Sequence, residues 1–133
     1  ELRMDKVKLN LLIVMAMAMM VVPMEATTLS VGDSIGWIRP ASPLYYLLWG
    51  ITHNVSVGDV LFFNFTTGYH NVVQVKREAF LACDASDPII SYTDGFAYMD
   101  IPIPNQYYII CSIGDHCQAG QRFVANVPAP KLL

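Results

Sequence analysis

Charged residues are scarce in this sequence, and positively charged ones are the scarcer kind. Lys and Arg number 8 and Asp and Glu number 11 among 133 residues, which gives a formal net charge of −3 at pH 7. No basic run, and no basic stripe interleaved with aromatic residues, is found after residue 26. We therefore expect no nucleic-acid partner and no electrostatic binding to anionic lipid.

A hydrophobic run long enough to span a membrane is also missing. The apolar run over residues 11–22 is shorter than the roughly 20 residues that a membrane helix needs. Basic residues precede the run, Pro23 ends it and small Ala26 follows, which is the order of a secretory signal peptide. We predict a signal peptide over residues 1–26, with upstream residues before Met4 and cleavage after Ala26. An uncleaved signal anchor is the alternative.

The rest of the chain has the length of one small domain. Residues 27–127 can bury a modest core, and residues 128–133 form a short proline-rich stub without the apolar tail of a glycolipid-anchor signal. Short β-branched and aromatic runs bounded by turn residues predict strands. These runs cover residues 27–31, 60–65, 71–75, 107–110 and 122–127. Many short strands in a domain of this size predict an all-β Greek-key sandwich.

Helical patterns are few. Short helices are expected over residues 45–49 and 76–83, and loops with short strands over residues 85–104. Within that last stretch, residues 96–101 are unusually apolar, which indicates either a core strand or an exposed patch.

Cysteine is scarce as well, and the three cysteines leave one thiol unpaired if the protein is secreted. His116 and Cys117 are neighbours, and neighbouring side chains in an extended segment point to opposite sides. If His116 faces a metal, Cys117 faces away from it and is available to bridge Cys83. Cys111 then remains as a thiolate. A bond between Cys111 and Cys117 is the alternative pairing.

The most informative segment carries Cys111, His116 and Gln121 at five-residue spacing. It lies between two predicted strands, so it forms a loop at one end of the sandwich. Zinc fingers instead use paired cysteines two to four residues apart, with a second pair elsewhere. His70, at the start of a predicted strand, supplies a second imidazole from a rigid element. His53 lies in a turn-like stretch and is expected at the surface.

These residue types favour copper. Two imidazoles and one thiolate, with a weak axial fourth ligand, form the blue-copper type of site. We therefore predict one copper ion, cycling between Cu(I) and Cu(II), held by His70, Cys111 and His116, with Gln121 in the axial place. Four ligands leave no open position for a substrate, so the sequence favours single-electron transfer over catalysis.

Two triplets are acceptors for N-glycosylation if the chain is secreted. They begin at Asn54 and at Asn64.

The chain resembles the phytocyanins, the plant branch of the cupredoxins, over residues 27–127. The matching residues are spread along the whole domain. They are Val31-Gly32-Asp33, Gly36-Trp37, Trp49, Val57-Gly58-Asp59-Val60-Leu61-Phe62-Phe63-Asn64, His70-Asn71-Val72-Val73, Cys83, Tyr108-Ile109-Ile110-Cys111, His116-Cys117 and Gly120-Gln121. Glutamine in the axial place is typical of the stellacyanin-type members.

The resemblance implies a cupredoxin-like fold, the four ligands named above and a disulfide between Cys83 and Cys117. It also implies a secreted protein, in the apoplast or on the outer face of the plasma membrane, with small redox partners that are mostly unidentified. We expect a monomer. Nodulin-like members keep the fold and lose the ligands, so a copper-free structural or signalling module is the main alternative. An enzyme is less favoured, because no carboxylate is placed to orient His116.

Overall fold

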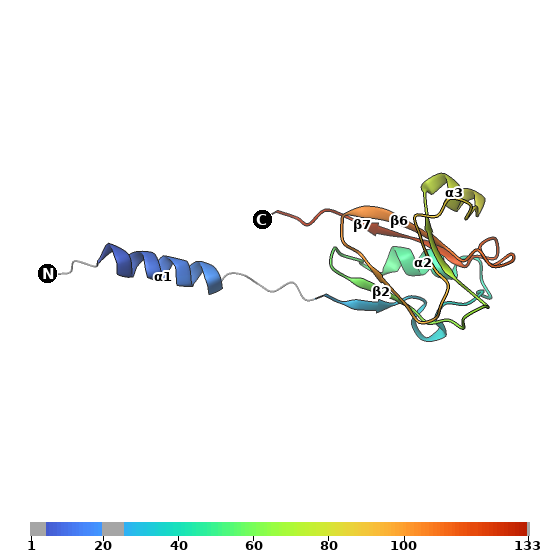
Figure 1. Cartoon of the computed structure of the whole chain (residues 1–133), viewed down its shortest axis with the longest axis horizontal. Coiled ribbons are helices and arrows are strands. Elements are labelled where there is room, and N and C mark those ends of the chain that lie inside the picture. The colour runs from blue at the N-terminus through green and yellow to red at the C-terminus, as the bar shows by residue number, and fades with distance from the viewer. Residues whose placement is uncertain (1–4, 20–25, 133) are drawn as a thin grey trace.

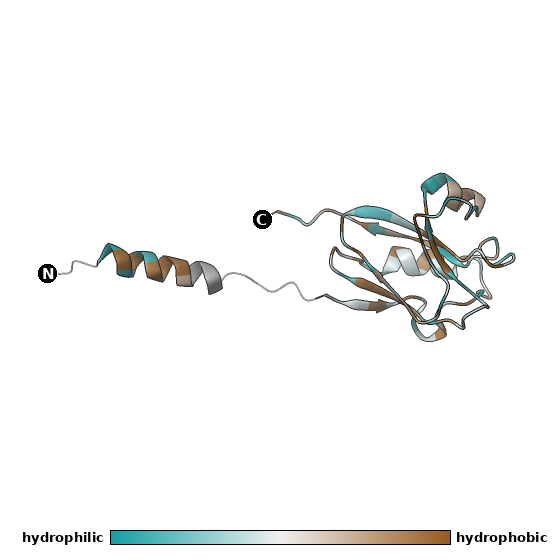
Figure 2. Ribbon diagram, in the orientation of Figure 1, coloured by the Kyte–Doolittle hydropathy of each residue, from teal (hydrophilic) through white to brown (hydrophobic). Residues whose placement is uncertain are grey.

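The computed structural model describes residues 5–19 and 26–132. Figure 1 shows helix α1 (Lys6–Met19) apart from two packed β-sheets. This helix exposes apolar side chains from Val7 to Met15, and they colour it largely brown in Figure 2. None of the described helices has the length and apolar character needed to cross a membrane. Residues 20–25 lie outside the described residues, so the predicted cleavage after Ala26 stays a prediction.

The two sheets form a sandwich. The first sheet has the order β1-β2-β5, with β1 parallel to β2 and β5 antiparallel to it. The second has the order β4-β3-β6-β7, and all of its pairs are antiparallel. The strands are β1 (Thr28–Ser30), β2 (Val60–Phe63), β3 (Val72–Val75), β4 (Ile90–Tyr92), β5 (Ala97–Asp100), β6 (Asn105–Ile110) and β7 (Arg122–Val127). The predicted all-β sandwich is confirmed.

Trp37 lies at the centre of the core between the sheets. Its ring packs edge-to-face on Tyr46, Phe63 and Phe123, with centroids 4.8, 5.2 and 5.8 Å away. Its indole N–H donates to the backbone oxygen of Asn71 over 2.8 Å. The core therefore holds the segment just before β3, where one candidate ligand lies.

Both predicted helices are confirmed. Helix α2 (Tyr45–Thr52) is longer than expected and packs on β7. Helix α3 (Arg77–Ala82) ends at Cys83, which has the left-handed conformation with φ of 51°. A single 3₁₀ turn, η1 (Asp33–Ile35), follows β1.

The apolar stretch over residues 96–101 is both a core strand and an exposed patch, the two alternatives that the sequence left open. Ala97, Met99 and Ile101 are buried in the core, whereas Phe96 and Tyr98 are 64% and 61% exposed. This alternation follows from the period of two in β5, which sends successive side chains to opposite faces.

Candidate metal centre

His70 is placed by the segment that leads into β3. It forms an isolated bridge with Thr67 and lies two residues before the strand begins. The side chain of its neighbour Asn71 bridges to the loop that follows β6: the Asn71 amide donates to the Ser112 hydroxyl, and the Ser112 N–H donates to Asn71 Oδ1, both over 2.8 Å. This pair of hydrogen bonds fixes the position of His70 relative to Cys111, and its role was not predicted from the sequence.

The other candidate ligands lie on the loop between β6 and β7. Cys111 directly follows β6, and its N–H donates to the Gln121 backbone oxygen over 3.0 Å. The Gln121 N–H in turn donates to the His116 backbone oxygen over 2.9 Å. These bonds fold the loop back on itself, so residues spaced five apart in the sequence face one another.

The loop is also anchored from outside. Arg39 forms a two-pronged ion pair with Asp115, at 2.9 and 3.1 Å, although both side chains are largely exposed. Gly120 has φ of 111°, and a Cβ there would lie 2.5 Å from the Pro43 backbone oxygen. Glycine at this position therefore allows both the left-handed backbone and the close approach of the segment at Pro43.

Four candidate donor groups converge on one point. His70 Nδ1 lies 3.2 Å from His116 Nδ1 and 3.2 Å from Gln121 Oε1. Cys111 Sγ lies 3.6 Å from His116 Nδ1. The ligand atoms of the two histidines and the cysteine all lie within 4.8 Å of one another. The structure thus brings together the four residues that the sequence analysis singled out.

The donor spacing fits a single metal ion. Three atoms bound at about 2.1–2.3 Å in a trigonal arrangement lie roughly 3.5–4 Å apart, and the separations here, from 3.2 Å to at most 4.8 Å, bracket that range. The Nε2 atom of Gln121 is buried and has no hydrogen-bond partner among the described residues. The Oε1 atom instead faces His70 Nδ1 at 3.2 Å, and this oxygen is the atom of the amide that a metal would take.

Burial is the largest influence on the pKa values of Cys111 and His70. It raises the pKa of the Cys111 thiol, while the backbone N–H groups of Asn71 and Ile113 oppose that rise. Burial also lowers the pKa of His70; repulsion from His116 lowers it further, and the hydrogen bond to Gln121 acts the other way. The lowered pKa of His70 favours the neutral imidazole, which is the form that binds metals, and metal binding would release the thiol proton of Cys111.

A disulfide joins Cys83 to Cys117, and Cys111 is the free, buried cysteine. The bond ties the end of α3 to the residue after His116. The expected pairing is thus present, and the alternative bond between Cys111 and Cys117 is wrong.

His53 lies outside the cluster, and its expected surface position is only partly right. Its ring stacks on Trp49 at 4.2 Å, and its Nε2 atom lies 3.3 Å from Asp33 Oδ1, with 30% of the side chain exposed. It supports the end of α2.

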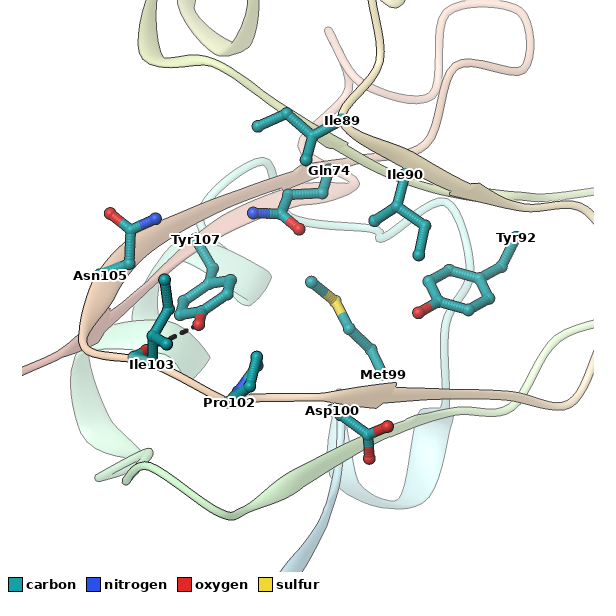
Figure 3. Close-up of a pocket in the computed structure, with 10 residues that line it drawn as sticks. All are labelled: Gln74, Ile89, Ile90, Tyr92, Met99, Asp100, Pro102, Ile103, Asn105 and Tyr107. Carbon is teal, nitrogen blue, oxygen red and sulfur yellow. Dashed lines mark hydrogen bonds between the residues drawn. The ribbon is translucent and has the colours of Figure 1, made fainter.

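A groove of about 490 Å³ opens between β4 and β5, and none of the four candidate ligands lines it. Figure 3 shows Met99, Tyr107 and Gln74 pointing into it, whereas Asp100 turns away. The groove is lined by no histidine or cysteine, so the candidate metal ligands are found at the cluster of His70, Cys111 and His116 and not here.

Known proteins resemble this chain over the same region. The family model of the plastocyanin-like domain matches residues 37–121, which include all four clustered residues. Stellacyanin of Toxicodendron vernicifluum is 34% identical over 103 residues, covering 76% of this chain and 96% of that protein. A blue copper protein of Arabidopsis thaliana is 36% identical over 99 residues, covering 74% of this chain but only 50% of that protein. The solved structure of cucumber stellacyanin with Cu²⁺ at pH 7.0 has a TM-score of 0.73 and 31% identity, covering 81% of this chain and 100% of that one.

Proposed function

The chain belongs to the plastocyanin-like family and is a phytocyanin related to stellacyanin; from this premise we propose that it is a type 1 copper protein that transfers single electrons. The convergence of His70, Cys111, His116 and Gln121 on one point carries the proposal. This donor set, two imidazoles and a thiolate with an axial amide oxygen, matches the blue-copper type.

Copper bound there supplies one-electron redox chemistry, and the protein residues determine its environment. Cys111 and Gln121 are fully buried, which excludes water from their side of the site. The hydrogen bonds of Asn71 with Ser112 hold the loop after Cys111 against the segment of His70. A donor set held in place in this way needs little rearrangement when the charge at the site changes.

Access to the site favours outer-sphere transfer. His70 and His116 are half-buried, whereas Cys111 and Gln121 have no exposed surface. A partner therefore reaches the site through the imidazole side, without entering a coordination position. We propose that the partners are small redox proteins or molecules and that the mature protein acts as a monomer.

The proposed location is outside the cell, in the apoplast or on the outer face of the plasma membrane. The predicted signal peptide over residues 1–26 and the disulfide between Cys83 and Cys117 support it, since disulfides persist in oxidising compartments. The proposed division into a domain over residues 27–127 and a stub over 128–133 fits the end of β7 at Val127.

A copper-free structural or signalling module is the alternative function. Adding Cu(II) to the metal-free protein distinguishes the two. We expect one equivalent to bind and to produce an intense charge-transfer band at roughly 600 nm. Absence of the band with the fold intact would favour the copper-free module.

The axial residue sets the direction of the reduction potential. An amide oxygen is a harder donor than a thioether, so Gln121 favours Cu(II). We expect Gln121→Met to raise the potential by on the order of 100 mV, measured by voltammetry of the copper-loaded protein. Gln74→Met is the matched control, because Gln74 is also a buried glutamine but is not among the clustered donors. An unchanged or lower potential in the Gln121 variant would contradict the axial role.

A further inference from the structure

Three aromatic side chains, two of them exposed and Phe62 half-buried, form a patch on the outer face of the first sheet. Phe62 and Tyr98 are cross-strand partners between β2 and β5, with ring centroids 4.9 Å apart. The ring of Phe96 stacks on Phe62 at 5.9 Å and 18°. Phe96 and Tyr98 are 64% and 61% exposed. Phe62, Phe96 and Tyr98 are called the aromatic patch below.

The neighbouring strand does not cover the patch. The partner of Phe62 on β1 is Ser30, which is small, polar and exposed. Clustered exposed aromatic rings usually mark a surface that receives a binding partner. A group that covers the patch has to lie beside it and present an apolar face to the rings.

Asn64 lies at the edge of the patch. It lies one residue beyond the end of β2 and two residues after Phe62. Phe63 and Phe65 are buried whereas Asn64 is exposed, so the alternation of the strand continues and places Asn64 on the same face as Phe62. The last pair of β2 with β5 is Phe63 with Ala97, and Asn64 and Phe96 are the residues directly next to that pair in the two chain segments. The Asn64 backbone oxygen accepts from the Trp37 N–H over 2.9 Å, which fixes the main chain. Its side chain is exposed and makes no hydrogen bond to any described residue.

We propose that Asn64 carries an N-glycan and that the first N-acetylglucosamine ring of this glycan packs on the aromatic patch. The acceptor triplet is Asn64-Phe65-Thr66. The C–H groups on one face of the sugar ring are apolar and slightly positive, whereas the aromatic face is negative. The sugar thus covers the apolar rings and keeps its hydroxyl groups in water.

The attachment uses a lipid-linked oligosaccharide pyrophosphate as donor. Asn64 Nδ2 forms a bond to C1 of the sugar, the bond from C1 to the phosphate oxygen breaks, and the amide loses one proton. The lipid pyrophosphate is the leaving group. This step rests on the predicted entry into the secretory pathway and is independent of the copper site.

The second acceptor triplet provides an internal contrast. Asn54 is exposed and follows the end of α2, but the residue two positions before it is Thr52. A glycan on Asn54 therefore has no aromatic ring at the position that Phe62 takes beside Asn64. Loss of the glycan is therefore expected to lower the stability at Asn64 but not at Asn54.

The test compares glycosylated variants of the full chain secreted from cultured plant cells and studied free of copper. Mass spectrometry is expected to find a glycan on Asn64. Asn64→Gln is expected to lower the thermal midpoint by about 4 °C or more, whereas Asn54→Gln leaves it unchanged. An unoccupied Asn64, or equal midpoints for the wild type and the Asn64 variant, would overturn the proposal.

A double-variant comparison separates sugar packing from other effects of the substitution. Phe96→Ser removes one exposed ring of the patch and leaves the core residues in place. In this background, Asn64→Gln is expected to lower the midpoint by less than half as much as in the wild type. Enzymatic trimming to one N-acetylglucosamine is expected to keep the wild-type midpoint. An equal loss in both backgrounds, or a full loss on trimming, would show that the first sugar does not act through the patch.

Discussion

Cys111→Ser is expected to abolish the blue absorption band of the copper-loaded protein while the fold persists. The band of a blue-copper site depends on the thiolate bound to the metal, and Cys111 is the free thiol of the cluster, 3.6 Å from His116 Nδ1. A serine hydroxyl stays protonated near neutral pH and is a hard donor, so it replaces neither the charge nor the softness of the sulfur. Visible absorption after addition of Cu(II) measures the result.

The fold is expected to survive this change for two reasons. The residue at position 111 holds the loop through its backbone N–H, which donates to the Gln121 backbone oxygen and is unaffected by the side chain. Serine is also nearly the size of cysteine, so the buried site keeps its volume. The unfolding free energy should fall by no more than about 1–2 kcal/mol.

His53→Gln is the matched control for this experiment. Of the three histidines in the sequence, His53 is the one outside the cluster, and its ring stacks on Trp49. This variant should keep the full blue band. A retained band in Cys111→Ser, or a lost band in His53→Gln, would contradict the ligand assignment.

Local pattern predicted most of the strands, and tertiary pairing determined their ends. The run over residues 122–127 matches β7 at both ends, because alternation continues along its whole length. Strand β6 instead begins at Asn105, two residues before the predicted start, because Asn105 pairs with Val127 on β7. The run over residues 60–65 likewise overestimated β2, which ends at Phe63, where its pairing with β5 stops.

The site was predictable where it is local and unpredictable where it joins distant segments. Cys111, His116 and Gln121 lie on one loop, so their spacing was visible in the sequence. The bonds that position this loop were not visible. The Asn71 amide and the Ser112 hydroxyl are 41 residues apart, and Arg39 and Asp115 are 76 residues apart. These polar residues match no pattern until the fold brings them together.

The disulfide is expected to make a large contribution to stability. It joins residues 34 apart, and closing a loop of that length in the unfolded chain corresponds to about 4 kcal/mol. We therefore expect the double variant Cys83→Ser, Cys117→Ser to lose about 2–5 kcal/mol of unfolding free energy, measured by urea denaturation. The double variant is preferred because either single variant leaves a thiol that can pair with Cys111.

Removal of the disulfide should also weaken copper binding. Cys117 is buried beside Phe80 and Ile110 and follows His116 directly. Without the bond, α3 no longer restrains this part of the loop, so His116 gains conformational freedom that copper binding has to remove. The affinity for Cu(II) should therefore fall together with the stability, although all four donor residues remain.

Reduction of the wild-type protein separates the crosslink from the packing of its sulfur atoms. The reduced protein keeps Cys117 in the core and Cys83 half-buried beside it, and loses only the bond. A purely crosslinking role therefore predicts the same loss of stability as in the double variant. A smaller loss on reduction would assign the difference to packing of Cys117 against Phe80 and Ile110. An unfolding free energy within about 1 kcal/mol of wild type in both proteins would contradict the stabilising role of the disulfide. An unchanged copper affinity would show that the disulfide is not needed to position His116, because the Arg39–Asp115 ion pair and the backbone hydrogen bonds of the loop are sufficient.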